Sequence, residues 1–147
     1  MRKNVLLIGP KIDREYHGGV VSHIKNILDS NLREEFNIKY HPIEFYKNNL
    51  LRTIYQFFIL FYKILYFRIE VIHFNSSLYY SSLFKTLIVI IISRISFTKI
   101  IVQFHGGDYR KIKFKNIFSL FLNLSDKILI LSKVQAEVFL KNRVINN

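Results

Sequence analysis

The sequence contains no cysteine, which excludes disulfide bonds, thiolate metal sites and cysteine nucleophiles. Four short motifs are also missing: the dinucleotide fingerprint G-x-G-x-x-G, the phosphate loop G-x-x-x-x-G-K-[ST], the zinc motif H-E-x-x-H and the nucleophile elbow G-x-S-x-G. These absences exclude several common nucleotide, zinc and hydrolase sites. We expect neither a metal nor a cofactor.

No apolar run is long enough to cross a bilayer. The stretch Leu50–Phe67 is interrupted by charged residues, and Leu83–Ile92 falls well short of the roughly 20 residues that a spanning helix needs. The apolar run after Met1-Arg2-Lys3 has only about five residues, too few for a signal peptide. We expect no transmembrane helix and a cytoplasmic location.

Acidic residues are scarce: 10 Asp and Glu stand against 22 Lys and Arg, a net charge of +12. This excess favours anionic partners, such as phosphorylated ligands, an acidic membrane surface or nucleic acid. A solvated lysine surface is the alternative interpretation. The basic residues are scattered and match no helix-turn-helix, RNA-recognition or zinc-finger pattern, so we do not expect a nucleic-acid partner.

Strand and helix patterns alternate along the whole chain. Residues 1–147 suit one domain, and half of them are hydrophobic. Predicted strands are Asn4–Ile8, Phe36–Ile43 (towards an edge), Glu70–Asn75, Lys99–Phe104 and Lys127–Leu131. One predicted helix follows Gly18-Gly19. Others span Leu50–Arg68, Leu78–Ser93 (capped by Ser76-Ser77) and about Lys111–Leu124. The last begins after Ser132, which forms a capping box with Gln135. This order predicts an α/β fold: a Rossmann-like doubly wound parallel sheet of about five strands in three α/β/α layers.

Ligands of such sheets bind beyond the carboxyl ends of the strands. One candidate there is Gly18-Gly19, a glycine turn that opens a helix and so leaves free backbone N–H groups for an anion. A second is the loop His105-Gly106-Gly107-Asp108, where an imidazole stands beside exposed backbone. A purely structural turn remains open for both. The patterns favour structural roles for His23 and His73.

The stretch Leu50–Phe67 is apolar almost all round its helical circumference, apart from a stripe containing Arg52, Gln56 and Lys63. Such a helix suits shallow contact with an anionic membrane, with Arg52 and Lys63 facing the lipid headgroups. Packing under a second domain or a second chain is the alternative.

Four segments together resemble the N-terminal half of a GT-B glycosyltransferase of the family-4 type. They are GGVVSHIKNIL after the first strand, VIHFNSS, IIVQFHGGDYRK and SDKILILSKVQAEVF. The resemblance covers most of the chain. It implies retaining transfer of a sugar, as by a hexosyltransferase, from a nucleotide-sugar donor to a glycan or lipid-linked acceptor in cell-surface polysaccharide synthesis.

The resemblance also implies roles for individual residues. Gly18 and Gly19 lie against the donor diphosphate, His105 faces the sugar as the catalytic residue, and Ser132 borders the cleft on the donor side. The acceptor side of the cleft is expected to include the following residues: His17, Asn75, Gly106, Gly107 and Asp108. Members of the family often dock on the inner face of the membrane through basic, apolar helices of this half, which fits Leu50–Phe67.

The sequence departs from the family in one respect. It has no counterpart of the nucleotide-binding half or of that half's two glutamates eight positions apart. We therefore expect the chain alone to bind a nucleotide sugar poorly and to be inactive. Three explanations stay open: a truncated product, a fragment of a longer enzyme, or one subunit of a split enzyme whose partner is a separate C-terminal half. The alternative function is a non-catalytic membrane-binding or partner-binding subunit of a split glycosyltransferase.

Overall fold

The computed structural model describes residues 2–12, 18–44, 50–107 and 115–141 of the chain. Its centre is one sheet of parallel strands: β1 (Lys3–Gly9), β2 (Phe36–Pro42), β3 (Val71–Ser76), β4 (Lys99–Phe104) and β5 (Lys127–Ile130). The strands lie in the order β2-β1-β3-β4-β5, with every neighbouring pair parallel. The predicted parallel sheet is confirmed, and β2 lies at an edge as predicted.

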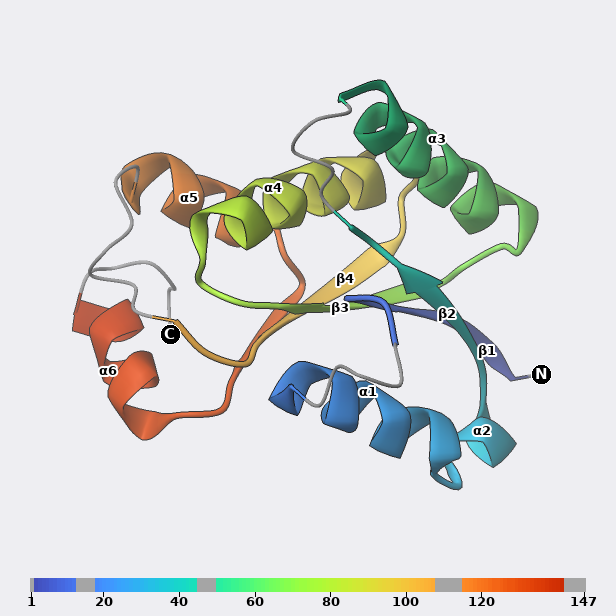
Figure 1. Ribbon diagram of the computed structural model, residues 1–147, viewed down its shortest axis with the longest axis horizontal. Helices are drawn as coiled ribbons and strands as arrows, with labels where there is room; N and C mark the ends of the chain where they lie inside the picture. The colour runs from blue at the N-terminus through green and yellow to red at the C-terminus, as the bar shows by residue number, and fades with distance from the viewer. Residues whose placement is uncertain (1, 13–17, 45–49, 108–114, 142–147) are drawn as a thin grey trace.

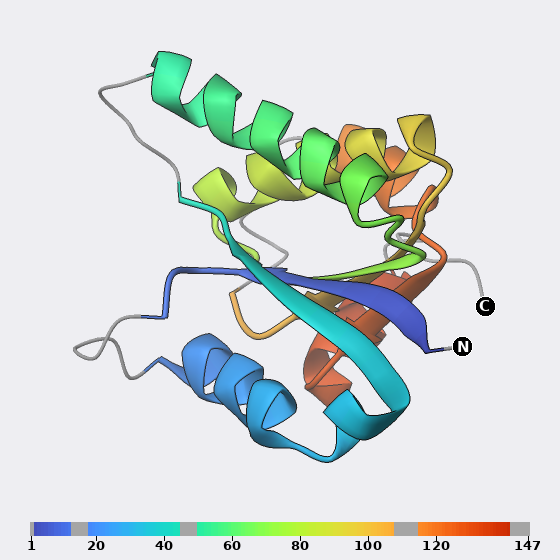
Figure 2. The ribbon, with the colours of Figure 1, turned by 90° about the vertical axis from the view of Figure 1, so that its right-hand side faces the viewer.

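Helices cover both faces of the sheet, so the predicted three layers are also confirmed. α3 (Leu50–Tyr66), α4 (Tyr80–Ile95) and α5 (Lys115–Leu122) lie on one face, and α1 (Gly19–Asp29) and α6 (Lys133–Lys141) lie on the other (Figures 1 and 2). The short α2 (Leu32–Glu35), which the pattern did not predict, connects α1 to β2. Because the chain reverses its direction across the sheet between β1 and β3, the topological switch point lies between these two strands.

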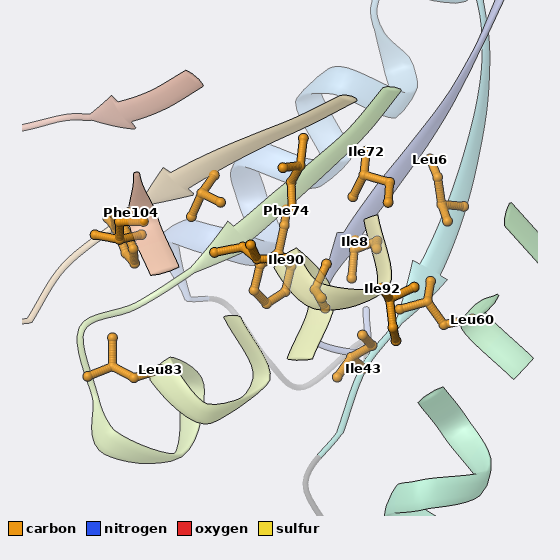
Figure 3. Packing of buried hydrophobic residues seen from close by; sticks show 14 of the residues in the cluster. Leu6, Ile8, Ile43, Leu60, Ile72, Phe74, Leu83, Ile90, Ile92 and Phe104 are labelled. Carbon is orange, nitrogen blue, oxygen red and sulfur yellow. The ribbon is translucent and has the colours of Figure 1, made fainter. Parts of the chain in front are cut away.

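The two faces of the central strands differ in chemistry. Leu6 and Ile8 of β1 and Ile72 and Phe74 of β3 belong to the apolar core beneath α3 and α4 (Figure 3). Their alternate neighbour His73 lies on the opposite face, near a histidine of α1. Since side chains of a strand alternate between faces, one face of β3 is apolar and the other carries polar groups.

The structure corrects the predicted start of α4. The helix begins at Tyr80, and its N-cap is Tyr79, with no side-chain cap. Ser76 instead ends β3, and Ser77 donates its hydroxyl to Ser82. The Leu78 N–H donates to the carbonyl of Gly106 at 2.8 Å, which holds this segment in the turn beside β4 and delays the helix.

Candidate functional site

A small pocket of about 130 Å³ lies at the carboxyl ends of β1 and β3, at the topological switch point. The backbone of Gly9-Pro10 and the first turn of α1, through Val20, form one wall. A Cβ on Gly9 would lie 2.3 Å from Cδ1 of Ile24, so glycine lets α1 pack closely on the end of β1. The position is the one where ligands bind in doubly wound folds.

Polar side chains of β3, of α4 and of the segment between them form the opposite wall: Asn75, Ser76, Ser77, Ser82 and Lys85. Burial lowers the pKa of the Lys85 ammonium, and the nearby carboxylate of Glu44 partly opposes this shift. The wall therefore combines one cation with several hydroxyl groups. This chemistry suits an anionic ligand such as a phosphate.

Asn75 connects the pocket to His105. Its amide nitrogen donates to the carbonyl of Ile8 at 3.4 Å, so its Oδ1 is the acceptor for His105 Nε2 at 2.8 Å. The amide orientation thus assigns the imidazole proton to Nε2 and leaves Nδ1 as the acceptor nitrogen. Burial lowers the pKa of His105 to about 4, and the rings of His23 and His73 add to the shift, so the imidazole is neutral near pH 7.

Three histidines from different elements gather on this face of the sheet. The ring of His23, from α1, lies 4.8 Å from that of His105 and 6.3 Å from that of His73, between centroids. His73 Nε2 is 2.8 Å from Oε1 of Gln103, whereas the buried Nε2 of His23 has no hydrogen-bond partner within the described part of the chain. Among the described residues, no group of His, Asp or Glu side chains is arranged to hold a metal ion.

The His105-Gly106-Gly107 loop is fixed from both sides. The His105 N–H donates to the carbonyl of Ser76, and Nε2 of Gln135 donates to the carbonyl of Gly107 at 2.9 Å. Gly107 has a φ of +100°, and a Cβ there would lie 2.6 Å from Cβ of Leu78. Only glycine fits this position, so Gly107 has a structural role that the sequence left open.

Gly18 and Gly19 differ from Gly107. Gly18 has an ordinary φ of −72°, and Gly19 is not among the residues with positive φ. A Cβ on either would meet no described atom within 4 Å. Neither turn geometry nor packing within the described ranges requires glycine here. Because neither residue has a side chain, the backbone at the start of α1 is accessible next to Val20 of the pocket.

The remaining predicted site residues fall in different places. Ser132 precedes α6, where its carbonyl accepts the Ala136 N–H at 2.9 Å. His17 and Asp108 lie outside the described residues. Arg52 is exposed on the first turn of α3, whereas Lys63 is half-buried and donates to Nδ1 of His41 at 3.2 Å.

Sequence reasoning missed three residues that the fold brings to this region. Lys85 lines the pocket, His23 lies against His105, and Gln135 holds Gly107. Lys85 is the one charged residue of the predicted helix Leu78–Ser93, and this was the only available signal for it. Gln135 was predicted as part of a capping box, and the structure shows its amide nitrogen donating a hydrogen bond to the carbonyl of Gly107.

A second hollow lies between α3 and α4. This groove has a volume of about 460 Å³, and the described residues that line it are all isoleucine or phenylalanine: Ile54, Phe57, Phe58, Phe61, Ile88, Ile92 and Ile95. None of the helices in the described ranges is long and apolar enough to span a bilayer.

No protein-family model matches the chain, and a search of curated proteins finds no match.

Proposed function

We propose that this domain is the acceptor-side half of a retaining GT-B glycosyltransferase, acting with a nucleotide-sugar-binding half. The observation that carries the proposal is the double role of Asn75, which lines the switch-point pocket and holds His105 at 2.8 Å. A neutral imidazole and a cationic, hydroxyl-rich pocket thereby lie together at the carboxyl edge of the sheet. A sugar phosphate has hydroxyl groups that the imidazole can bind and a phosphate that the cation and hydroxyl groups of the pocket can bind.

In this proposal His105 contacts the transferred sugar. Because its Nε2–H is used by Asn75, Nδ1 is available to accept a hydrogen bond from a sugar hydroxyl. The lowered pKa keeps the ring in this neutral form at pH 7, so His105 positions the sugar and does not act as a general acid.

Gly18 and Gly19 contact the donor diphosphate in the same proposal. Their conformation and packing give no structural reason for glycine, and their open backbone stands at a helix start with no acidic residue in its first turn. Backbone N–H groups at a helix N-terminus favour phosphate. A side chain at either position would block the approach of the phosphate.

The test is a transfer assay. The chain is mixed with nucleotide-sugar-binding halves of GT-B enzymes, radiolabelled nucleotide sugars and a bacterial membrane extract, and label in the glycan or lipid fraction is counted. We expect transfer that requires both halves. His105→Ala should lower it about 100-fold or more, as expected for loss of a positioned catalytic contact.

His41→Asn is the matched control, since His41 is a buried histidine whose partner is Lys63 of α3. It should leave the transfer rate close to that of the wild type. Equal transfer by His105→Ala and the wild type would refute the role given to His105.

A second candidate function, membrane binding without catalysis, is favoured by the face formed by α3, α4 and α5. The charged residues on the described parts of these helices are all basic, and two of them are exposed: Arg52 of α3 and Arg94 of α4, which pairs with Asp126. Large hydrophobic side chains are exposed there, including Tyr62 at 62% and Phe97, just after α4, at 97%. Aromatic and basic side chains on one face suit an anionic membrane surface.

Flotation with vesicles of anionic lipid tests this candidate. Binding should be strongest at low salt, where charges are least screened, and the double variant Tyr62→Ser/Phe97→Asn should weaken it. Val134→Asn is the control, because Val134 is 70% exposed on α6, on the opposite face. Absence of binding at low salt would exclude this candidate.

A further inference from the structure

One side of α4 joins the two hollows of the molecule. Lys85 lines the switch-point pocket, and Ile88, Ile92 and Ile95 line the groove beside α3. Their spacing of three, seven and ten residues from Lys85 places all four side chains on one side of the helix. A cation therefore lies at one end of a continuous apolar stripe.

The groove is of a size that holds a molecule. Its volume of about 460 Å³ lies within the range of about 300–1,000 Å³ typical of ligand sites. Its walls offer no polar side chain, while Phe58 and Ile95 remain 67% and 61% exposed. Covering exposed apolar side chains with a hydrocarbon removes them from water and so lowers the free energy.

The pocket end has the opposite chemistry. Lys85 lines the pocket together with Ser77 and Ser82, whose hydroxyl groups are 2.9 Å apart. Glu44 is the acidic residue that interacts with Lys85. One phosphate group would satisfy the ammonium and the hydroxyl groups together.

We propose that the acceptor is a phosphate-bearing lipid, whose phosphate binds Lys85 and whose hydrocarbon chain lies in the groove between α3 and α4. The charge complementarity at Lys85 and the continuity of the stripe along α4 identify this occupant. The inference rests on the proposed transferase function and narrows its acceptor from a glycan or lipid to a phosphoryl lipid. Such an acceptor reaches the cleft from a membrane that the same helical face contacts.

Isothermal titration calorimetry with dodecyl phosphate, below the concentration at which it forms micelles, tests the proposal on the chain alone. Inorganic phosphate and dodecyltrimethylammonium are the comparison ligands, because one lacks the chain and the other reverses the charge. We expect dodecyl phosphate to bind about tenfold or more tightly than either. Dodecyltrimethylammonium loses a charged hydrogen bond and inorganic phosphate loses a buried apolar group, and either loss predicts a difference of this size.

Two variants separate the ends of the site. Lys85→Met keeps the length of the side chain and should weaken dodecyl phosphate binding about tenfold, whereas Lys99→Met, an exposed lysine at the start of β4, should not. The double variant Phe58→Ser/Ile95→Ser should weaken binding by a similar factor without unfolding the chain, because both residues are exposed.

Equal binding of dodecyl phosphate and dodecyltrimethylammonium would overturn the proposal, since it would show a groove indifferent to charge. Binding of inorganic phosphate as tight as that of dodecyl phosphate would overturn it too, by assigning the pocket to free phosphate. No donor or second half is present in this assay, so its failure leaves the transfer assay to judge the proposed function separately.

Discussion

Replacing Gly107 by alanine tests the most constrained backbone position of the candidate site. Its φ of +100° costs a residue with a Cβ about 1–2 kcal/mol. The new Cβ would lie 2.6 Å from Cβ and 2.9 Å from Cα of Leu78, and overpacking of this kind costs about 1–3 kcal/mol. The backbone of Leu78 cannot withdraw easily, because its N–H donates to the carbonyl of Gly106.

One effect opposes these costs. Alanine restricts the unfolded chain more than glycine does, which stabilises the folded state by about 0.4–1 kcal/mol. We therefore expect Gly107→Ala to lower the free energy of unfolding by about 2–4 kcal/mol, a large part of the 5–15 kcal/mol typical of a domain.

Urea denaturation followed by far-ultraviolet circular dichroism measures this change. Gly106→Ala is the matched control, since Gly106 lacks a positive φ and a Cβ there meets no described atom within 4 Å. The control should be neutral or slightly stabilising. If the two variants unfold at the same urea concentration, or if Gly106→Ala is the less stable, the account of this loop is wrong.

Two further predictions concern buried polar groups. Burial, followed by the charge of Lys63, lowers the pKa of His41 from 6.5 to about 4, so the unfolded chain binds this proton at higher pH than the folded chain does. The stability that neutral His41 contributes is complete above pH 6.5, and about 2–3 kcal/mol of it is lost as the pH falls to 4. In denaturation experiments across this pH range, His41→Asn should lose less stability than the wild type. The Thr86 hydroxyl donates its proton to the carbonyl of Ser82 at 2.8 Å and therefore accepts from the Ser76 hydroxyl at 2.9 Å, so Thr86→Val should cost about 1–2 kcal/mol. Adding Ser76→Ala should restore part of that loss in urea denaturation, and a purely additive double variant would contradict the assigned pair.

The sequence predicted the elements of this fold more accurately than their ends. The apolar run Lys99–Phe104 was predicted with its observed limits, because a strand buried on both faces of a parallel sheet is continuously apolar. The start of α4 was misplaced by two residues, since a hydrogen bond from Leu78 to Gly106, distant in sequence, decides it. Local capping signals cannot reveal such a bond.

The candidate site was predictable only in part. The sequence identified His105-Gly106-Gly107 as a ligand-facing loop from its place after a predicted strand. It could not identify Lys85 as part of the pocket or His23 as a neighbour of His105, because each lies on a helix whose rotation and crossing are set by packing. Which side of a helix meets a pocket depends on contacts between elements.

Periodicity and composition alone determined an alternating α/β chain, a parallel sheet, and loops that meet at the carboxyl edge. These properties follow from local patterns of apolar residues, which are present in the sequence itself. Tertiary structure alone decided that Asn75 bonds both Ile8 and His105, and that Lys85 and three isoleucines of α4 link a polar pocket to an apolar groove. The physical reason is that hydrogen bonds and surface hollows join residues far apart in the chain, and only the packing of the sheet and helices brings those residues together.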